Sequence, residues 1–292
     1  MKKTILCTAL ALIALLPAFG QSLSTDIFLF DIAPQQSGYR ISKPINITRH
    51  EGYDNQPEFS ADSHKIYYVS ATDTNQTDLM VYEIATGKSR HLSHSRESEF
   101  SPKLTSKSDQ ISVVRIDNDH FQRLYSYSIT DSSAKLLSGS NDSVAYYCWL
   151  SDSVVAMACL NGKMDLYLCN VKSNTSRLVA GNVGRTLLKI PSTSDLLFTV
   201  PEDSGFVLKK FDTHSGETAV FAPRLFETAD FAFTPDGELL GGHQGKLYRY
   251  TASEGNWKLM ADLQSEIGLF YRLAVSPDGK KIAVVSYSGK RP

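Results

Sequence analysis

The chain has 292 residues, with 30 lysines and arginines against 31 aspartates and glutamates, 42% hydrophobic residues and a formal net charge of −1. This balance argues against a large nucleic-acid or acidic-membrane surface, and the apolar content excludes a wholly disordered chain. The chain contains 4 cysteines, too few for a disulfide scaffold at this size.

The first twenty residues have the pattern of a secretory signal peptide. Lys2 and Lys3 precede an apolar run over residues 5–16, and the small-x-small triplet Ala18-Phe19-Gly20 follows it. The run is shorter than the ~20 apolar residues that span a bilayer, so we expect no membrane span. We predict a signal peptide over residues 1–20, cleavage near Gly20, and one exported domain over residues 21–292, periplasmic or secreted.

The remaining chain repeats a short anchored strand, a polar turn and a second apolar strand. The repeat is clearest at residues 58–69, 232–237 and 274–285. The apolar anchors of the six copies are separated by 45, 45, 41, 43 and 42 residues, and they are Phe59, Leu104, Trp149, Ile190, Phe233 and Val275. This spacing is typical of the four-stranded blades of a β-propeller, which take about 40–45 residues each.

A second pattern, in phase with the first, marks the third strand of each blade. It appears at residues 78–84, 123–129, 165–171 and 246–250, with a weaker copy at 207–211. The last copy of the repeat ends after its second strand, whereas residues 26–30 carry the third-strand pattern at the start of the mature chain. We predict an all-β, six-bladed propeller of four-stranded antiparallel blades, its last blade completed by the N-terminal strands, which removes exposed sheet edges.

Three copies carry motifs that resemble the repeats of TolB-type propellers. These motifs are Ser276-Pro277-Asp278-Gly279, Thr234-Pro235-Asp236-Gly237 and the segment 56–62, and the resemblance extends over essentially the whole mature chain. It implies an exported bacterial propeller related in fold to TolB. TolB also has an N-terminal α/β domain that works with a peptidoglycan-associated lipoprotein, and only about 25 residues precede the first full blade here, so that partnership is not implied.

Catalytic and metal-binding motifs are largely missing from the sequence. His91 and His94 are two potential zinc ligands, whereas a zinc site needs three or four. Oxygen ligands at residues 73–78 and 117–119 have calcium-like spacing but lack the glycine and distal glutamate of a calcium loop. The three cysteines of the mature chain all fall in the third blade, and we predict no internal disulfide among them.

The loops that lead into the first strand of each blade gather at one end of a propeller's channel. Counting back five and three residues from the anchors places charged and aromatic side chains at this end. The candidate partner-binding residues at the channel mouth are Tyr53, Asp54, Arg96, Glu97, Glu99, Arg185, Asp230, Tyr271 and Arg272, with Tyr146 as a further aromatic. The alternative is a solvated rim whose charges pair across the channel and hold neighbouring blades together.

We therefore predict a non-catalytic binding or scaffold propeller of the cell envelope. It would recognise a protein or peptide, or a saccharide, at the channel mouth, without a cofactor, a metal or nucleic acid. The alternative is a hydrolase or lyase that acts on a saccharide or peptide with channel carboxylates, for which Asp54 and Glu99 are the best pair. An accessory subunit of an enzyme is a third interpretation.

Overall fold

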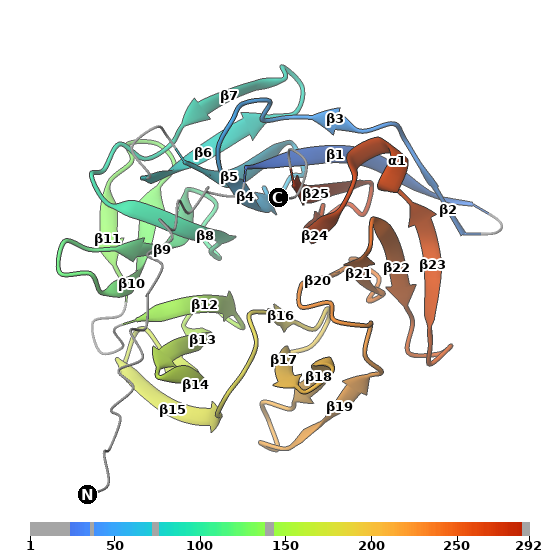
Figure 1. The fold of residues 1–292 in the computed structure, drawn as a ribbon. Coiled ribbons are helices and arrows are strands. Elements are labelled where there is room, and N and C mark those ends of the chain that lie inside the picture. Colours follow the sequence, from blue (N-terminus) through green and yellow to red (C-terminus); the bar gives the residue numbers. More distant parts are fainter. Residues whose placement is uncertain (1–23, 36–37, 72–75, 138–142, 288–292) are drawn as a thin grey trace, which may run out of the picture.

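The computed structural model describes residues 24–35, 38–71, 76–137 and 143–287, so the expected signal peptide lies outside the described residues. The strands form six antiparallel sheets arranged in a ring around a central axis, which confirms the predicted propeller (Figure 1). Strands β8, β12, β16, β20 and β24 lie on the inner side of the ring, and β7, β15, β19 and β23 lie on its outside.

Five blades are continuous in sequence, each running from its innermost to its outermost strand. The first is β4 (Asp54–Phe59), β5 (Lys65–Ala71), β6 (Thr77–Glu83) and β7 (Lys88–His91). The second is β8 (Ser98–Leu104), β9 (Gln110–Ile116), β10 (Gln122–Ser128) and β11 (Ala134–Leu136). The third is β12 (Val144–Trp149), β13 (Val154–Asn161), β14 (Lys163–Asn170) and β15 (Thr175–Ala180). The fourth is β16 (Leu187–Lys189), β17 (Leu196–Glu202), β18 (Gly205–Phe211) and β19 (Thr218–Ala222). The fifth is β20 (Phe231–Phe233), β21 (Leu239–His243), β22 (Lys246–Tyr250) and β23 (Trp257–Asp262), and the short helix α1 (Gln264–Ile267) follows it.

The sixth blade joins the two ends of the chain, as the sequence pattern predicted. Strands β24 (Phe270–Val275) and β25 (Lys281–Tyr287) supply its inner half, and β1 (Thr25–Gln35) pairs antiparallel with β25 from Thr25↔Tyr287 to Asp31↔Lys281. Strands β2 (Gly38–Ile41) and β3 (Ile45–Asn46) both pair with β1 on its outer side. The N-terminal strand therefore closes the ring non-covalently.

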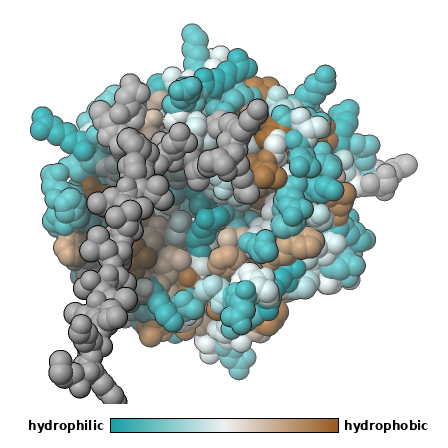
Figure 2. Space-filling view, in the orientation of Figure 1, coloured by the Kyte–Doolittle hydropathy of each residue, from teal (hydrophilic) through white to brown (hydrophobic). Residues whose placement is uncertain are grey.

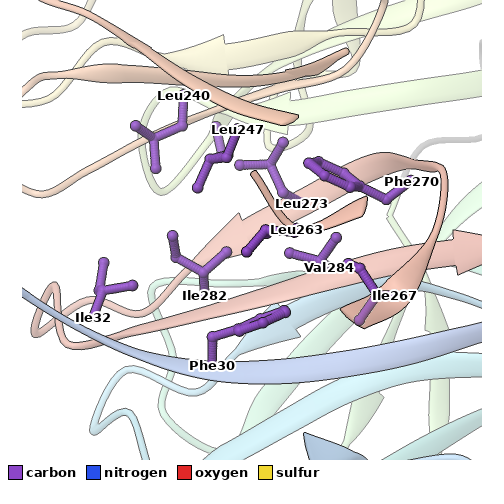
Figure 3. Packing of buried hydrophobic residues seen from close by; sticks show 11 residues of the cluster. Phe30, Ile32, Leu240, Leu247, Leu263, Ile267, Phe270, Leu273, Ile282 and Val284 are labelled. Carbon is purple, nitrogen blue, oxygen red and sulfur yellow. The ribbon is translucent and has the colours of Figure 1, made fainter. Parts of the chain in front are cut away.

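Strand β1 is buried on both faces because its side chains alternate between two neighbouring blades. Ile27 and Leu29 join the apolar cluster toward the first blade, whereas Phe30 and Ile32 join the cluster toward the fifth. Figure 3 shows the second of these clusters, in which Phe30 faces Ile282 and Val284 of β25. Burial of such apolar area between blades supplies most of the favourable free energy of folding.

The Pro-Asp-Gly motifs form the turns between first and second strands. In the last copy, Ser276 Oγ donates to Asp278 Oδ1 at 2.6 Å, and the Gly279 N–H donates to the Ser276 carbonyl at 2.8 Å. Gly279 has φ +68°, a left-handed conformation that suits glycine. Ser60 and Asp62 repeat the hydroxyl-to-carboxylate contact at 2.5 Å, so the motif's serine and aspartate build this turn even where glycine is absent.

The first strands are bulged on the way to their anchors. The register between first and second strands shifts in the first, second, third and sixth blades, and Gln56 and Ser101 sit in the shifted segments with φ values of +57° and +52°. A bulge inserts an extra residue and reverses the face to which the side chains before it point. This local feature decides which residues reach the channel.

No disulfide joins Cys148, Cys159 and Cys169 to one another in the described part of the chain, as predicted. Burial raises the pKa of Cys148 to about 11 and that of Cys159 to about 12. Both thiols are therefore protonated at neutral pH, whereas the thiolate is the reactive form of cysteine.

Candidate functional site

The first strands of the six blades surround a central cavity of about 270 Å³. Every blade contributes the residue three positions before its anchor, and these residues are Gln56, Ser101, Tyr146, Leu187, Asp230 and Arg272. Residues one position before the anchors also line the cavity, among them Glu58, Lys103 and Lys189. Figure 2, in the same orientation as Figure 1, shows hydrophilic residues in the hollow at the centre of the ring.

An arginine–aspartate–arginine cluster spans three blades at one end of this cavity. Arg185 precedes β16, Asp230 precedes β20, and Arg272 lies on β24. Arg185 Nη2 donates to Asp230 Oδ2, while Arg272 Nε donates to Asp230 Oδ1 at 3.3 Å. Arg272 also donates from Nη1 to Asn55 Oδ1 at 2.8 Å, which links the sixth blade to the first. The pairing of charges across the channel was the alternative interpretation of this rim, and it is present here.

The two arginines differ in how far their side chains are buried. The Arg272 side chain is 14% exposed, whereas that of Arg185 is 34% exposed. Burial lowers the pKa of Arg272, but Asp230 and the neighbouring tyrosines raise it more, so the net shift is upward and the guanidinium stays charged. The Nε of Arg185 is buried and has no hydrogen-bond partner among the described residues. This donor is enclosed by the protein, whereas the rest of the Arg185 side chain is partly exposed at the cavity.

Tyrosines surround this cluster. Tyr271 accepts a hydrogen bond from Asn55 Nδ2, and its ring lies 5.7 Å from the guanidinium carbon of Arg185 and 5.8 Å from that of Arg272. Burial raises the pKa of Tyr271 to about 12 and also raises that of Tyr53. Both phenols are therefore neutral at physiological pH and offer aromatic surface and hydroxyl groups.

The lining of the central cavity carries more positive than negative charge. Its cationic side chains are Lys103, Lys189, Arg185 and Arg272, against the two anionic side chains of Glu58 and Asp230. The whole protein has a formal net charge of −1, so this excess is local. A concave site with net positive charge favours anionic groups.

Asp54 lies away from the channel, so the expectation that it faces the mouth is corrected. Its side chain is fully buried, and Oδ1 lies 3.0 Å from Nε2 of His50. Ser70 Oγ is 3.1 Å from the same ring nitrogen. A serine–histidine–aspartate relay needs the two ring nitrogens to contact different partners, so this group is no catalytic triad. It joins the first blade to β1, because Thr25 Oγ1 donates to the Asp54 carbonyl at 2.9 Å.

The buried Asp54 carboxyl gives a testable pH dependence. Burial raises its pKa from 3.8 to about 6, against the smaller lowering effects of Ser70 and His50. A raised carboxyl pKa contributes stability at low pH that is lost as the pH rises through 6. We expect wild type to lose about 2 kcal/mol relative to Asp54→Asn between pH 4.5 and 8, measured by urea unfolding at both pH values.

Asp131→Asn is the matched control for this experiment. Asp131 lies in a turn, and hydrogen bonds from Ser133 lower its pKa to about 2. The Asp131 carboxyl is deprotonated throughout the range from pH 4.5 to 8. The difference in the free energy of unfolding between Asp131→Asn and wild type therefore stays constant over this range. A constant difference for Asp54→Asn as well would contradict the raised pKa of Asp54.

Glu99 is also buried within the blades and does not line the central cavity. It accepts hydrogen bonds from Ser93 at 2.9 Å, from Ser95 and from Tyr127 at 2.8 Å. Burial raises its pKa in spite of these donors. Asp54 and Glu99 are therefore each enclosed by their own partners, and the structure does not bring them together as the carboxylate pair on which the enzyme alternative was based.

The other candidates lie outside the cluster. Arg96 is exposed, and its N–H donates to the Glu97 carboxylate at 3.2 Å, in the loop before β8. Asp117 and Asp119 both pair with Arg123 at 2.8 Å, so the calcium-like turn has its carboxylates bound to cations of the protein. The other such segment includes residues 72–75, which lie outside the described residues. Nowhere in the described ranges do three histidine, cysteine or acidic side chains gather as metal ligands.

Asn55, Lys103 and Lys189 belong to the site but were not singled out from the sequence. The lysines lie one residue before their anchors, on the same strand face as the residues three before. Strict alternation from each anchor would have found them. Asn55 gave no such signal, because its contact with Arg272 depends on how the sixth blade meets the first.

Two further cavities adjoin the mouth, and Arg185 lines both. One, of about 290 Å³, lies between the fifth and sixth blades and is lined by polar residues that include Thr228, His243 and Tyr287. The other, of about 690 Å³, extends over the second to fourth blades and is mostly apolar. The mouth thus has a cationic centre with a polar branch and an apolar branch.

This geometry defines a six-bladed β-propeller with a cationic channel mouth. Its fold is that of the TolB-type propellers. A putative TolB from Agrobacterium tumefaciens has a TM-score of 0.71 with 12% identity, over 92% of this chain and 100% of that one. TolB from Acinetobacter baumannii has a TM-score of 0.58 with 12% identity, over 92% of this chain and 65% of that one.

The structure of an oligogalacturonate lyase in complex with manganese is also similar, with a TM-score of 0.58 and 14% identity over 86% of this chain and 83% of that one. No protein-family model matches the chain, and no curated protein matches its sequence. At these identities the likeness establishes the fold, while function depends on the site. No helix within the described segments is long and apolar enough to cross a membrane.

Proposed function

We propose that the protein is an exported, non-catalytic binding propeller of the cell envelope that recognises a protein or peptide partner through carboxylate groups at the channel mouth. The observation that carries this proposal is the excess of cationic side chains around the central cavity, four against two. The signal-peptide pattern of residues 1–20 supports export, and the likeness to TolB propellers supports a scaffold that presents a binding surface.

Arg185 is the residue through which the partner is bound. It is the more exposed of the two arginines, and it lines all three cavities at the mouth. A guanidinium can bind a carboxylate through two parallel hydrogen bonds, and such charge-assisted bonds are strong where water is partly excluded. Tyr53 and Tyr146 add rigid aromatic area beside it.

Affinity capture of the mature protein from an envelope extract, quantified by mass spectrometry, tests this function. Arg185→Gln keeps a polar side chain but removes the charge, and it is expected to reduce capture of the principal partner about tenfold or more. Arg90→Gln, on the exposed outer strand β7, is the matched control and should capture as wild type does. Equal capture by the Arg185 variant and wild type would contradict the proposed site.

A second candidate is a lyase that acts on an acidic saccharide. The cationic channel and the structural likeness to oligogalacturonate lyase favour it. Asp54 and Glu99 do not reach a substrate in the central cavity in this arrangement, because both are buried and neither lines the cavity. Incubation of the purified protein with oligogalacturonate, followed by the absorbance of an unsaturated product, separates this candidate from a binding role.

A further inference from the structure

An apolar groove opens beside Arg185 on the mouth face of the propeller. Its volume is about 690 Å³, within the range of cavities that hold small ligands and large side chains. We call it the side groove, and it is lined chiefly by Phe100, Tyr146, Leu160, Met164, Pro201 and Phe206. Leu160 is 44% exposed at the turn between β13 and β14, so apolar surface here faces solvent.

The floor of the side groove depends on a glycine. Gly184 precedes β16, and a Cβ atom at this position would lie 3.0 Å from Cδ1 of Phe206. The Phe206 ring therefore lies against the bare backbone of Gly184, which is the residue that precedes Arg185 in the sequence. This close packing fixes an aromatic wall next to the guanidinium, so that an apolar surface and a cation are presented together.

The central cavity and the side groove meet at three shared residues. Gln56, Tyr146 and Arg185 line both. A ligand held at Arg185 by a carboxylate thus has the apolar groove directly beside it. The partly exposed guanidinium of Arg185 and the net positive lining supply the charge complementarity for that carboxylate.

We propose that the mouth binds the C-terminal residue of a partner polypeptide, with its terminal carboxylate on Arg185 and a large apolar side chain in the side groove. This inference rests on the proposed function and specifies its ligand. In a C-terminal residue one Cα carries both the carboxylate and the side chain. A single residue can therefore place its carboxylate on Arg185 and its side chain in the side groove. A chain end also needs no exit path, which suits a central cavity of only about 270 Å³.

Fluorescence anisotropy with synthetic probes tests the inference. The probe is fluorescein-labelled Gly-Ser-Gly-Ser-Gly-Phe with a free C-terminal carboxylate. It is compared with the same peptide as a C-terminal amide, and with a free acid that ends in Gly instead of Phe. The Phe acid is expected to bind about tenfold or more tightly than either, because each comparison peptide lacks one of the two paired contacts.

Substitutions in the groove test the apolar half of the site separately. Leu160→Asn and Met164→Gln are expected to weaken binding of the Phe acid about threefold to tenfold and to leave the Gly acid unchanged. Leu178→Asn is the matched control, because Leu178 is 58% exposed on the outer strand β15. Melting curves of all variants confirm that they are folded. Unchanged binding of the Phe acid by folded groove variants would overturn the assignment of the side groove.

An internal acidic probe separates failure of this inference from failure of the proposed function. The probe is the amidated peptide Gly-Ser-Asp-Phe-Gly-Ser. If it binds in an Arg185-dependent way while the Phe acid and its amide bind equally, the carboxylate-binding function stands and the C-terminal assignment is overturned. If neither probe responds to Arg185→Gln, both proposals are overturned.

Discussion

Removal of strand β1 by deletion of residues 24–35 is expected to abolish cooperative folding of the propeller and to cause association of the chains. The deletion exposes the edge of β25 along the register from Thr25↔Tyr287 to Asp31↔Lys281. It also opens two apolar clusters, because β1 contributes Ile27 and Leu29 to one and Phe30 and Ile32 to the other. Unpaired edges and exposed apolar surface both promote aggregation.

A point substitution measures the same closure without deleting a strand. Phe30 is 1% exposed, and Phe30→Ala is expected to lower the free energy of unfolding by about 3–5 kcal/mol. Its neighbour Asp31 is 66% exposed and pairs with Lys281 at the surface, so Asp31→Asn should change stability by less than about 1 kcal/mol. Urea unfolding and light scattering report both effects. A monomeric deletion variant with wild-type melting would show that the ring does not depend on β1.

The sequence was sufficient to predict this architecture because propeller blades repeat. Each anchor has an equivalent in every other blade, so one ambiguous strand is supported by five others. The incomplete last copy and the orphan strand pattern at residues 26–30 together required closure by the N-terminus, and the pairing of β1 with β25 confirms it. Repetition averages out the local ambiguity that limits the interpretation of a single strand.

The candidate site was predictable only in part, and the β-bulges explain the difference. The residues three positions before the anchors all line the cavity. Of the residues five positions before the anchors, only Arg185 lines it, whereas Asp54 and Glu99 are buried within the blades. Simple alternation gives both positions the same face, whereas the register shifts after Asn55 and Phe100 reverse it. The positive φ of Gln56 and of Ser101 marks these bulges in the structure, but neither residue type announces one in a sequence.

The second large effect concerns Arg272, whose role is to hold three blades together. It donates to Asp230 on the fifth blade and to Asn55 on the first, with a side chain only 14% exposed. Arg272→Met keeps most of the apolar stem but leaves the mostly buried Asp230 paired with Arg185 alone. We expect the free energy of unfolding to fall by about 1–3 kcal/mol, since the mostly buried Asp230 loses one of its two cationic partners and Asn55 Oδ1 loses a donor.

A double-mutant cycle distinguishes this structural role from binding. Arg272→Met and Asp230→Asn each remove the same contact between the two side chains, so the two changes together should cost about 0.5–3 kcal/mol less than the sum of the single changes. Arg185→Gln, at a half-exposed position, should cost less than about 1 kcal/mol. Chemical unfolding of wild type, of the single variants Arg272→Met and Asp230→Asn, and of the double variant measures the coupling. Additive effects would mean that Arg272 and Asp230 act independently. Arg185→Gln removes the contact between Arg185 and Asp230 but leaves Arg272 bound to Asp230 and Asn55. Loss of partner capture by an Arg185→Gln variant that unfolds at the wild-type denaturant concentration can therefore be assigned to binding.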